Sequence, residues 1–254
     1  MVDASDFFTI ADGRIAAIGL TMAAATPGQA FELHGSATVG KNIVAPNQAQ
    51  IEGTAGFKLN VVMNGSGNGL KDLAASKADV AMISAPLKVE ERLTNAKKPG
   101  SLNVSGMQVF PVGKAAINVV VNPGNPVSLS EDQVRGIFTG QITNWKDVGG
   151  SDSPILVVVE APGQGTRSVV ESVFLQDKGF ADNARVMRAL AQVTQVVGQA
   201  PNAIGYGNSS SIKGSSVKVV DGIEIAQPLS LVTKGDPSPK MKKLIEAVAA
   251  VSGK

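Results

Sequence analysis

The chain has 254 residues, enough for one large domain or two small ones with a substantial core. Its net charge is +2, and no lysine-rich block or alternation of aromatic and basic residues occurs, so a nucleic-acid-binding groove is not expected. The absence of cysteine excludes disulfides, thiolate zinc sites and cysteine nucleophiles. Aromatic residues make up 4% of the chain and hydrophobic residues 43%, so valine and alanine must fill the interior.

Residues 1–30 are predicted to form a signal-like or mobile N-terminal extension. The apolar run 15–25 has the length of the apolar region of a signal peptide, and residues 26–30 offer a cleavage region. The aspartates before position 15 outnumber the single arginine there, Arg14, although an export signal favours positive charge. No apolar run approaches the roughly 20 residues of a membrane span. We therefore expect a periplasmic or secreted protein, with a mobile extension as the alternative interpretation of this segment.

The first half of the folded part is predicted to alternate strands, loops and helices. Strands are expected at 31–34, 58–63 and 79–83, each followed by a turn or glycine-rich loop. Helices are expected from about 40 to 52, with an interruption at Pro46, and over 70–78. Three strand–loop–helix units within so short a span favour a parallel α/β sheet. The polar segment 88–99 is expected to be a solvated helix or loop.

The second half is predicted to continue the same pattern. Strands are expected at 107–112, 115–121 and 228–233, and another short strand is expected to end at 205–207. Helices are expected at 131–139, 182–197 and 239–251. Ser130 and Gln133 form a capping box at the start of the first of these helices, and Gly140 ends it. Trp145 is expected to be an anchor in a turn.

The segment from Ile155 to Leu175 is predicted to be a strand, a glycine loop and the start of a helix. Five apolar residues, 155–159, are typical of a strand buried on both faces, and Glu160 follows them. Pro162 and two glycines then end the strand. The free N–H groups at the helix start would suit an anion, yet the residue that ends the strand is itself acidic.

Seven motifs along the chain together resemble one family. They are GSATVGKN (35–42), NGSGNGLKDL (64–73), ADVAMISAPL (78–87), AINVVVNPGNP (116–126), LSEDQVRGIFTGQITNWKDVGG (129–150), GQGTR (163–167) and PNAIGYGN (201–208). In this order they closely resemble the phosphate-binding proteins of ABC importers, within the type II periplasmic binding proteins. The likeness extends from about residue 31 to residue 250, and the segment 129–150 is its most specific part.

The resemblance implies an α/β fold of two lobes, with mainly parallel sheets flanked by helices and two strands crossing the hinge. The first lobe would contain 31–112 and 208–254, and the second 113–207. It also implies a monomeric solute-binding protein that works with an ABC permease and closes on a small oxyanion or related polar solute. No cofactor, metal or nucleic acid is expected.

The resemblance also implies where the solute binds. Ser36, Thr38 and the Val39 N–H match the first binding loop, Ser66 and Gly67 the second, and Gly165 and Thr166 the third. At three further ligand-binding positions this sequence departs from the family: the ligand-facing arginine falls on Glu160, the acid that accepts a proton from hydrogen phosphate on Ser84, and a serine on Gln164.

Glu160 in place of arginine predicts weak phosphate binding in the family's usual geometry. An unscreened pair of like charges at about 4 Å costs on the order of 4 kcal/mol at an effective dielectric of about 20, or about three decades of affinity. Four interpretations of Glu160 are open. It pairs with Arg167 or a lysine, its carboxylate occupies the anion site at the helix start, it meets a cationic group of another solute, or it turns into solvent.

Two other functions compete with solute uptake. A secreted or signalling module of the same fold that does not bind phosphate is one alternative. An enzyme is the other, but His34 is the only histidine, so a Ser–His–acid triad would have to use it. A histidine at the end of a strand is more often packed or hydrogen-bonded, and we expect no enzymatic activity.

Overall fold

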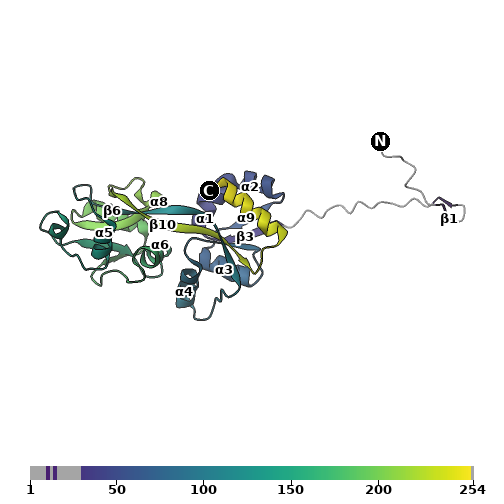
Figure 1. Ribbon diagram of the computed structural model, residues 1–254, viewed down its shortest axis with the longest axis horizontal. Coiled ribbons are helices and arrows are strands. Elements are labelled where there is room, and N and C mark those ends of the chain that lie inside the picture. The colour runs from purple at the N-terminus through teal and green to yellow at the C-terminus, as the bar shows by residue number, and fades with distance from the viewer. Residues whose placement is uncertain (1–9, 12–13, 16–29, 253–254) are drawn as a thin grey trace.

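The computed structural model describes residues 10–11, 14–15 and 30–252 (Figure 1). The predicted signal-like extension, residues 1–30, lies almost wholly outside the described residues. Within it, two short strands pair antiparallel, β1 (Ile10–Ala11) and β2 (Arg14–Ile15). The folded part begins at β3 (Phe31–Gly35), as the alternating segment predicted.

One mixed eight-stranded sheet runs through residues 30–252 and joins two lobes (Figure 1). Its order is β4–β3–β5–β10–β6–β9–β7–β8. The strands are β3, β4 (Leu59–Val62), β5 (Val80–Ile83), β6 (Met107–Val121), β7 (Leu156–Glu160), β8 (Arg185–Met187), β9 (Ala203–Asn208) and β10 (Lys218–Lys234). Strands β3, β4 and β5 are parallel to one another, as are β7, β8 and β9. This confirms the predicted α/β class.

Two long strands, β6 and β10, pair antiparallel and extend from one lobe to the other (Figure 1). The prediction of separate strands at 107–112 and 115–121 was wrong, because the chain passes Gly113 without a turn. Its pairing with β10 shifts register there, between Leu229–Gly113 and Ser230–Pro111, so an irregularity replaces the expected break. The last strand also begins ten residues earlier than predicted, at Lys218.

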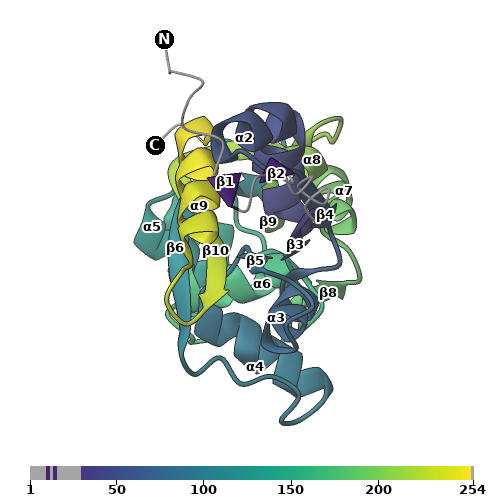
Figure 2. The same cartoon turned by 90° about the vertical axis from the view of Figure 1, so that its right-hand side faces the viewer.

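The first lobe packs helices on both sides of β3, β4 and β5. Helix α1 (Ala37–Val39) continues through a π-helical turn (Gly40–Val44) and a 3-10 turn (Ala45–Asn47) into α2 (Gln48–Ala55), so the chain is irregular around Pro46, as predicted. Figure 2 shows α2 beside the C-terminal helix α9 (Pro239–Val251), and Ile51 and Leu244 share one core. Leu70 and Leu73 of α3 (Ser66–Ala74) pack with Ile83 and Val232.

Helix α4 (Leu87–Lys97) corrects the prediction of a solvated segment. It is a helix, but Val89, Glu90 and Thr94 are buried. Ala85 and Val89 pack in the same cluster as second-lobe residues, and Arg92 forms an ion pair with Asp177 of that lobe (3.2 Å). The first lobe therefore contacts the second through α4.

The second lobe contains β7, β8 and β9 with α5 (Glu131–Phe138), α6 (Gly165–Val169), α7 (Leu190–Gln199) and α8 (Ser209–Ile212). Its core includes Phe138, Phe174 and Tyr206, and Trp145 is a buried anchor whose Nε1 donates to the carbonyl of Asn202 (2.9 Å). The predicted helix over 182–197 begins only at Leu190, because 185–187 form β8 beside β7. The capping box at Ser130 is present.

The boundaries predicted for the lobes, after residues 112 and 207, stay a prediction, although α8, which was expected in the first lobe, contacts α7 and β9 of the second. Val220, Ile223 and Ile225 of β10 pack in the second-lobe cluster, whereas Leu229 and Leu231 pack in the first.

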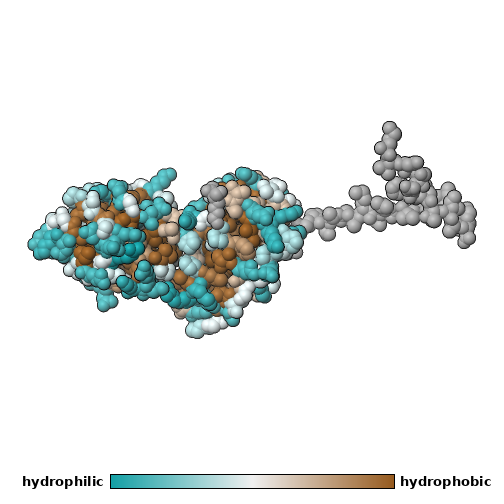
Figure 3. All heavy atoms as spheres, viewed as in Figure 1, coloured by the Kyte–Doolittle hydropathy of each residue, from teal (hydrophilic) through white to brown (hydrophobic). Residues whose placement is uncertain are grey.

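Hydrophilic residues dominate the outer surface of the half that carries α5 in Figure 3. In the part of the chain that the structure describes, no helix is both long and apolar enough to cross a membrane.

Candidate functional site

Three loops of the first lobe meet at the carboxyl ends of β3, β4 and β5. The N–H of Gly65 donates to the carbonyl of Gly35 (2.9 Å), and the N–H of Ser36 donates to that of Met82 (2.9 Å). Gly35 has φ +134°, and a side chain at Gly69 would collide with the Gly35 backbone. The glycines thus let the starts of α1 and α3 approach closely, and N–H groups at the start of α3 favour an anion.

A cavity of about 340 Å³ opens between these loops and the glycine loop of the second lobe. It brings together five of the predicted site residues, Ser66, Gly67, Ser84, Gln164 and Gly165. Lys71, Lys97 and Lys98 also line it. The second and third predicted binding loops, about 100 residues apart in sequence, therefore face one cavity between the lobes.

Thr38, of the first predicted loop, lines a larger neighbouring cavity of about 710 Å³. The two cavities adjoin where Gln227, which lines the larger one, donates from Nε2 to the carbonyl of Ser84 (3.0 Å), which lines the smaller. All three predicted loops therefore lie around Ser84 and Gln227.

Four of the predicted site residues line neither cavity: Ser36, Val39, Glu160 and Thr166. Ser36 is buried and caps α1, since its Oγ accepts from the N–H groups of Thr38 (3.2 Å) and Val39 (3.4 Å). In the described structure the serine thus orders the first loop. A direct contact of these four residues with solute stays a prediction.

Glu90 is the site residue that the sequence reasoning missed. It lies on α4, lines the smaller cavity and is only 7% exposed. Burial raises the pKa of its carboxyl. Hydrogen bonds from the Ser66 hydroxyl and the N–H groups of Ser84 and Ala85 lower the pKa, but the net shift is upward. A buried acid thus lies beside Ser84, where the family's own acid is missing. Its spacing, three residues after Leu87 and three before Leu93, could have indicated an inward-facing position.

Glu160 ends β7 and is buried, with 5% of its surface exposed. Its Oε2 has no hydrogen-bond partner among the described residues. Its N–H donates to the hydroxyl of Tyr206 (3.1 Å), which fixes the strand end. Burial raises the pKa of the Glu160 carboxyl to about 7, opposed by the backbone N–H and the positive charge of Arg167. The interpretation that Glu160 turns into solvent is therefore wrong.

Arg167 is engaged by other groups. Its Nε donates to Glu171 Oε1 (2.7 Å), its Nη1 donates to the backbone carbonyl of Glu160 (2.8 Å), and the guanidinium lies over the ring of Phe180. No ion pair between the side chains of Arg167 and Glu160 occurs among the residues described. The backbone N–H of Arg167, in the first turn of α6, forms a hydrogen bond with the Glu160 carboxyl that lowers its pKa. The contacts therefore support the interpretation in which that carboxyl lies at the start of α6.

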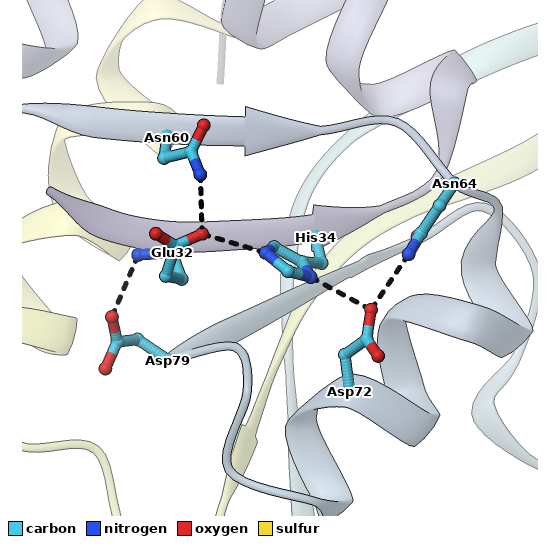
Figure 4. Close-up of polar contacts among 6 residues, drawn as sticks. All are labelled: Glu32, His34, Asn60, Asn64, Asp72 and Asp79. Atoms are coloured by element: carbon cyan, nitrogen blue, oxygen red, sulfur yellow. Dashed lines mark hydrogen bonds and ion pairs between the residues drawn. The ribbon is translucent and has the colours of Figure 1, made fainter.

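His34 is held between two carboxylates, as Figure 4 shows. Its Nδ1 lies 2.9 Å from Asp72 Oδ2, and its Nε2 lies 2.9 Å from Glu32 Oε2. Burial lowers the pKa of the imidazole, but hydrogen bonds and charges of Asp72 and Glu32 outweigh it and raise the pKa overall. Both ring nitrogens are therefore occupied, and His34 is not arranged to activate a serine.

Comparison with known proteins assigns the family. The sequence profile of the PBP superfamily domain matches residues 24–251, so the chain belongs to this superfamily of periplasmic binding proteins. Over 200 residues it is 28% identical to the phosphate-binding protein PstS of Bacillus subtilis (strain 168). That match covers 76% of this chain and 62% of the relative, so the chain spans less than two thirds of that relative's length.

Two solved structures are similar along most of the chain. One is a putative phosphate ABC transporter substrate-binding protein with bound phosphate from Clostridium perfringens, at 26% identity and a TM-score of 0.61. The other is an ABC-type phosphate transport receptor from Vibrio cholerae, at 24% identity and a TM-score of 0.63. Each match covers 87% of this chain and 93% of the other. The second likeness supports the fold alone, a two-lobed binding-protein fold.

Proposed function

We propose that this protein is the solute-binding component of an ABC-type importer, and that it holds phosphate or a related small oxyanion between its lobes. One observation carries the proposal: the starts of α3 and α6, from different lobes, face the same polar cavity beside Ser84. Helix starts offer N–H groups and partial positive charge to an anion, and lobe closure would complete the enclosure. The similarity to the phosphate-binding protein of Bacillus subtilis supports the same solute.

The partner, location and mechanism follow from this proposal. A permease would recognise the closed form, so the protein would act outside the cytoplasm, in the periplasm or secreted, as a monomer. It would not act on the solute chemically. His34 is occupied on both sides by carboxylates, and in the described part of the chain no group of three or more acidic or histidine residues is placed to hold a metal ion.

The two buried carboxyls make the proposed site dependent on pH. Burial raises the pKa of both Glu90 and Glu160, so protonation occurs more readily than for an exposed glutamate. A neutral carboxyl does not repel an anion, and Glu90, which lines the smaller cavity, could then also donate a hydrogen bond to it. Anion affinity is therefore expected to rise as the pH falls through about 7, the pKa of Glu160.

Isothermal titration with orthophosphate and sulfate at pH 6 and pH 8 tests the proposal. We expect saturable one-to-one binding of orthophosphate, tighter at pH 6, together with a smaller radius of gyration in solution scattering as the lobes close. Because orthophosphate itself titrates in this range, sulfate, whose charge does not change, serves as the control for the pH effect. Absence of binding of either anion at millimolar concentration would overturn the proposal and favour the signalling module.

A further inference from the structure

The larger of the two cavities carries a charge pattern that orthophosphate binding does not use. Lys41 of the first lobe, Lys114 of β6 and Lys213 of the second lobe all line it. No acidic residue is among its lining residues, and none of the three lysines has an ion-pair partner among the described residues. A cleft lined by charge of a single sign concentrates counter-ions, so this cavity attracts anions.

This cavity, which we name the lysine cavity, has a lining that is hydrogen-bonded to that of the proposed anion site. Thr38 of the first binding loop lines it, and Gln227 joins it to Ser84 of the smaller cavity through a hydrogen bond of 3.0 Å. Its volume of about 710 Å³ lies within the range of small-molecule sites, about 300–1,000 Å³. Asn208, Ser209 and Ser210 add neutral hydrogen-bonding groups from the second lobe.

We propose that the lysine cavity is a second anion subsite, so that the preferred solute is longer than orthophosphate and carries a second anionic group. The inference rests on the proposed function, because the first anionic group would bind at the loops around Ser66 and Ser84. The second group would lie along the crossing strands and meet Lys114 and Lys213. Inorganic pyrophosphate is the simplest solute of this kind. Because these lysines come from the hinge and the second lobe, such a solute would also bridge the lobes.

Calorimetric titration with three probes at pH 7.5 tests this inference. Pyrophosphate carries a second anionic group, glycerol 3-phosphate has added length without one, and orthophosphate is the reference. We expect pyrophosphate to bind at least about ten-fold more tightly than orthophosphate, since two lysine contacts at an accessible site contribute about 0.7 kcal/mol each. Glycerol 3-phosphate is expected to bind no more tightly than orthophosphate.

A matched pair of double variants assigns the effect to the lysine cavity. K114Q/K213Q removes two charges from it, and K242Q/K243Q removes two charges from exposed positions of α9 that line neither cavity. We expect K114Q/K213Q to lose about ten-fold in pyrophosphate affinity while its orthophosphate affinity changes less than about three-fold. K242Q/K243Q is expected to change neither by more than about two-fold.

The outcomes separate this inference from the proposed function. If orthophosphate binds but pyrophosphate binds no better in the unmodified protein, the subsite is refuted and the proposed function stands. Equal losses in both double variants would also refute the subsite, because the preference would then reflect net charge. If none of the three probes binds, the proposed function fails and the subsite fails with it.

Discussion

The half-buried acids of the first lobe and the buried Glu160 of the second differ in their partners. In the first lobe Glu32 and Asp72 are partnered by His34, and Asn60 and Asn64 complete the network (Figure 4). In the second lobe Glu160 Oε2 is buried without a partner, and the neighbouring arginine is engaged by Glu171. A buried charge costs stability unless it has a hydrogen-bond or ion-pair partner. A buried polar group that lacks such a partner therefore needs another explanation, such as a role in function. The contrast indicates that the first cluster is structural, and it supports the proposal that Glu160 acts at the solute site.

The largest expected effect comes from removing the charge of Glu160. In the folded state its pKa is about 7 against an ordinary value of 4.5, so the folded state binds the proton more tightly. Its ionisation therefore lowers stability progressively as the pH rises from about 4.5 to 7. Since one pKa unit corresponds to about 1.4 kcal/mol, E160Q is expected to raise the free energy of unfolding at pH 8 by about 2–3 kcal/mol.

Urea denaturation at pH 4.5 and pH 8 measures this effect. The difference between E160Q and the unmodified protein should be small at pH 4.5 and large at pH 8. E246Q, which removes an exposed acid of α9, is the control and should change the free energy of unfolding by less than about 0.5 kcal/mol. An equal effect of E160Q at both pH values would show that burial does not raise the pKa of the Glu160 carboxyl.

The next largest effect is expected at Ser66, in the first-lobe part of the site. S66A removes a hydroxyl that lines the smaller cavity and would donate to bound orthophosphate. A hydrogen bond to a charged group contributes about 1.5–3 kcal/mol, so orthophosphate affinity is expected to fall about 10- to 100-fold. Titration calorimetry measures the loss, with S151A, an exposed serine outside the cavities, as the control. Unchanged affinity would remove Ser66 from the solute contacts.

His34 should have a smaller effect on stability, and substituting it should matter most at low pH. Its pKa is raised in the folded state, so its stabilisation is fully present below about 6.5 and is lost as the pH rises through the raised value. H34Q is expected to lower the free energy of unfolding by about 2 kcal/mol at pH 5.5 and by much less at pH 9. Denaturation at the two pH values provides the measurement. A loss of equal size at pH 9 would mean that the imidazole acts as a neutral group.

The smallest effect is expected at the ion pair between the lobes. Arg92 and Asp177 are both more than half exposed, and exposed pairs contribute about 0–1 kcal/mol. R92A is therefore expected to change the free energy of unfolding by less than about 1 kcal/mol and orthophosphate affinity by less than about three-fold. A larger loss of affinity would indicate that this contact controls lobe closure.

The sequence predicted most of the fold because strong local signals agreed with the tertiary structure. The capping box at Ser130, the apolar run before Glu160 and the amphipathic segment 239–251 all lie where they were expected. The errors occur where long-range pairing decides. Residues 107–121 form one strand because β10 pairs along their length, and 185–187 form a strand because β7 lies beside them.

The candidate site was predicted less completely than the fold. Motifs indicated Ser66, Ser84 and Gly165, which line one cavity, because helix starts and strand ends have recognisable residues. Glu90 was missed because its charge suggested exposure, although its spacing from Leu87 and Leu93 favours an inward-facing position. The convergence of Lys114 and Lys213 could not be predicted, because they lie on different elements that meet only in the folded protein.

A crystal structure of the protein grown with orthophosphate tests the central claim most directly. The proposal predicts one ordered anion between the lobes, within hydrogen-bonding distance of Ser66 and of backbone N–H groups at the starts of α3 and α6. An anion bound only on the outer surface, or an empty cleft in a protein saturated with orthophosphate, would contradict it.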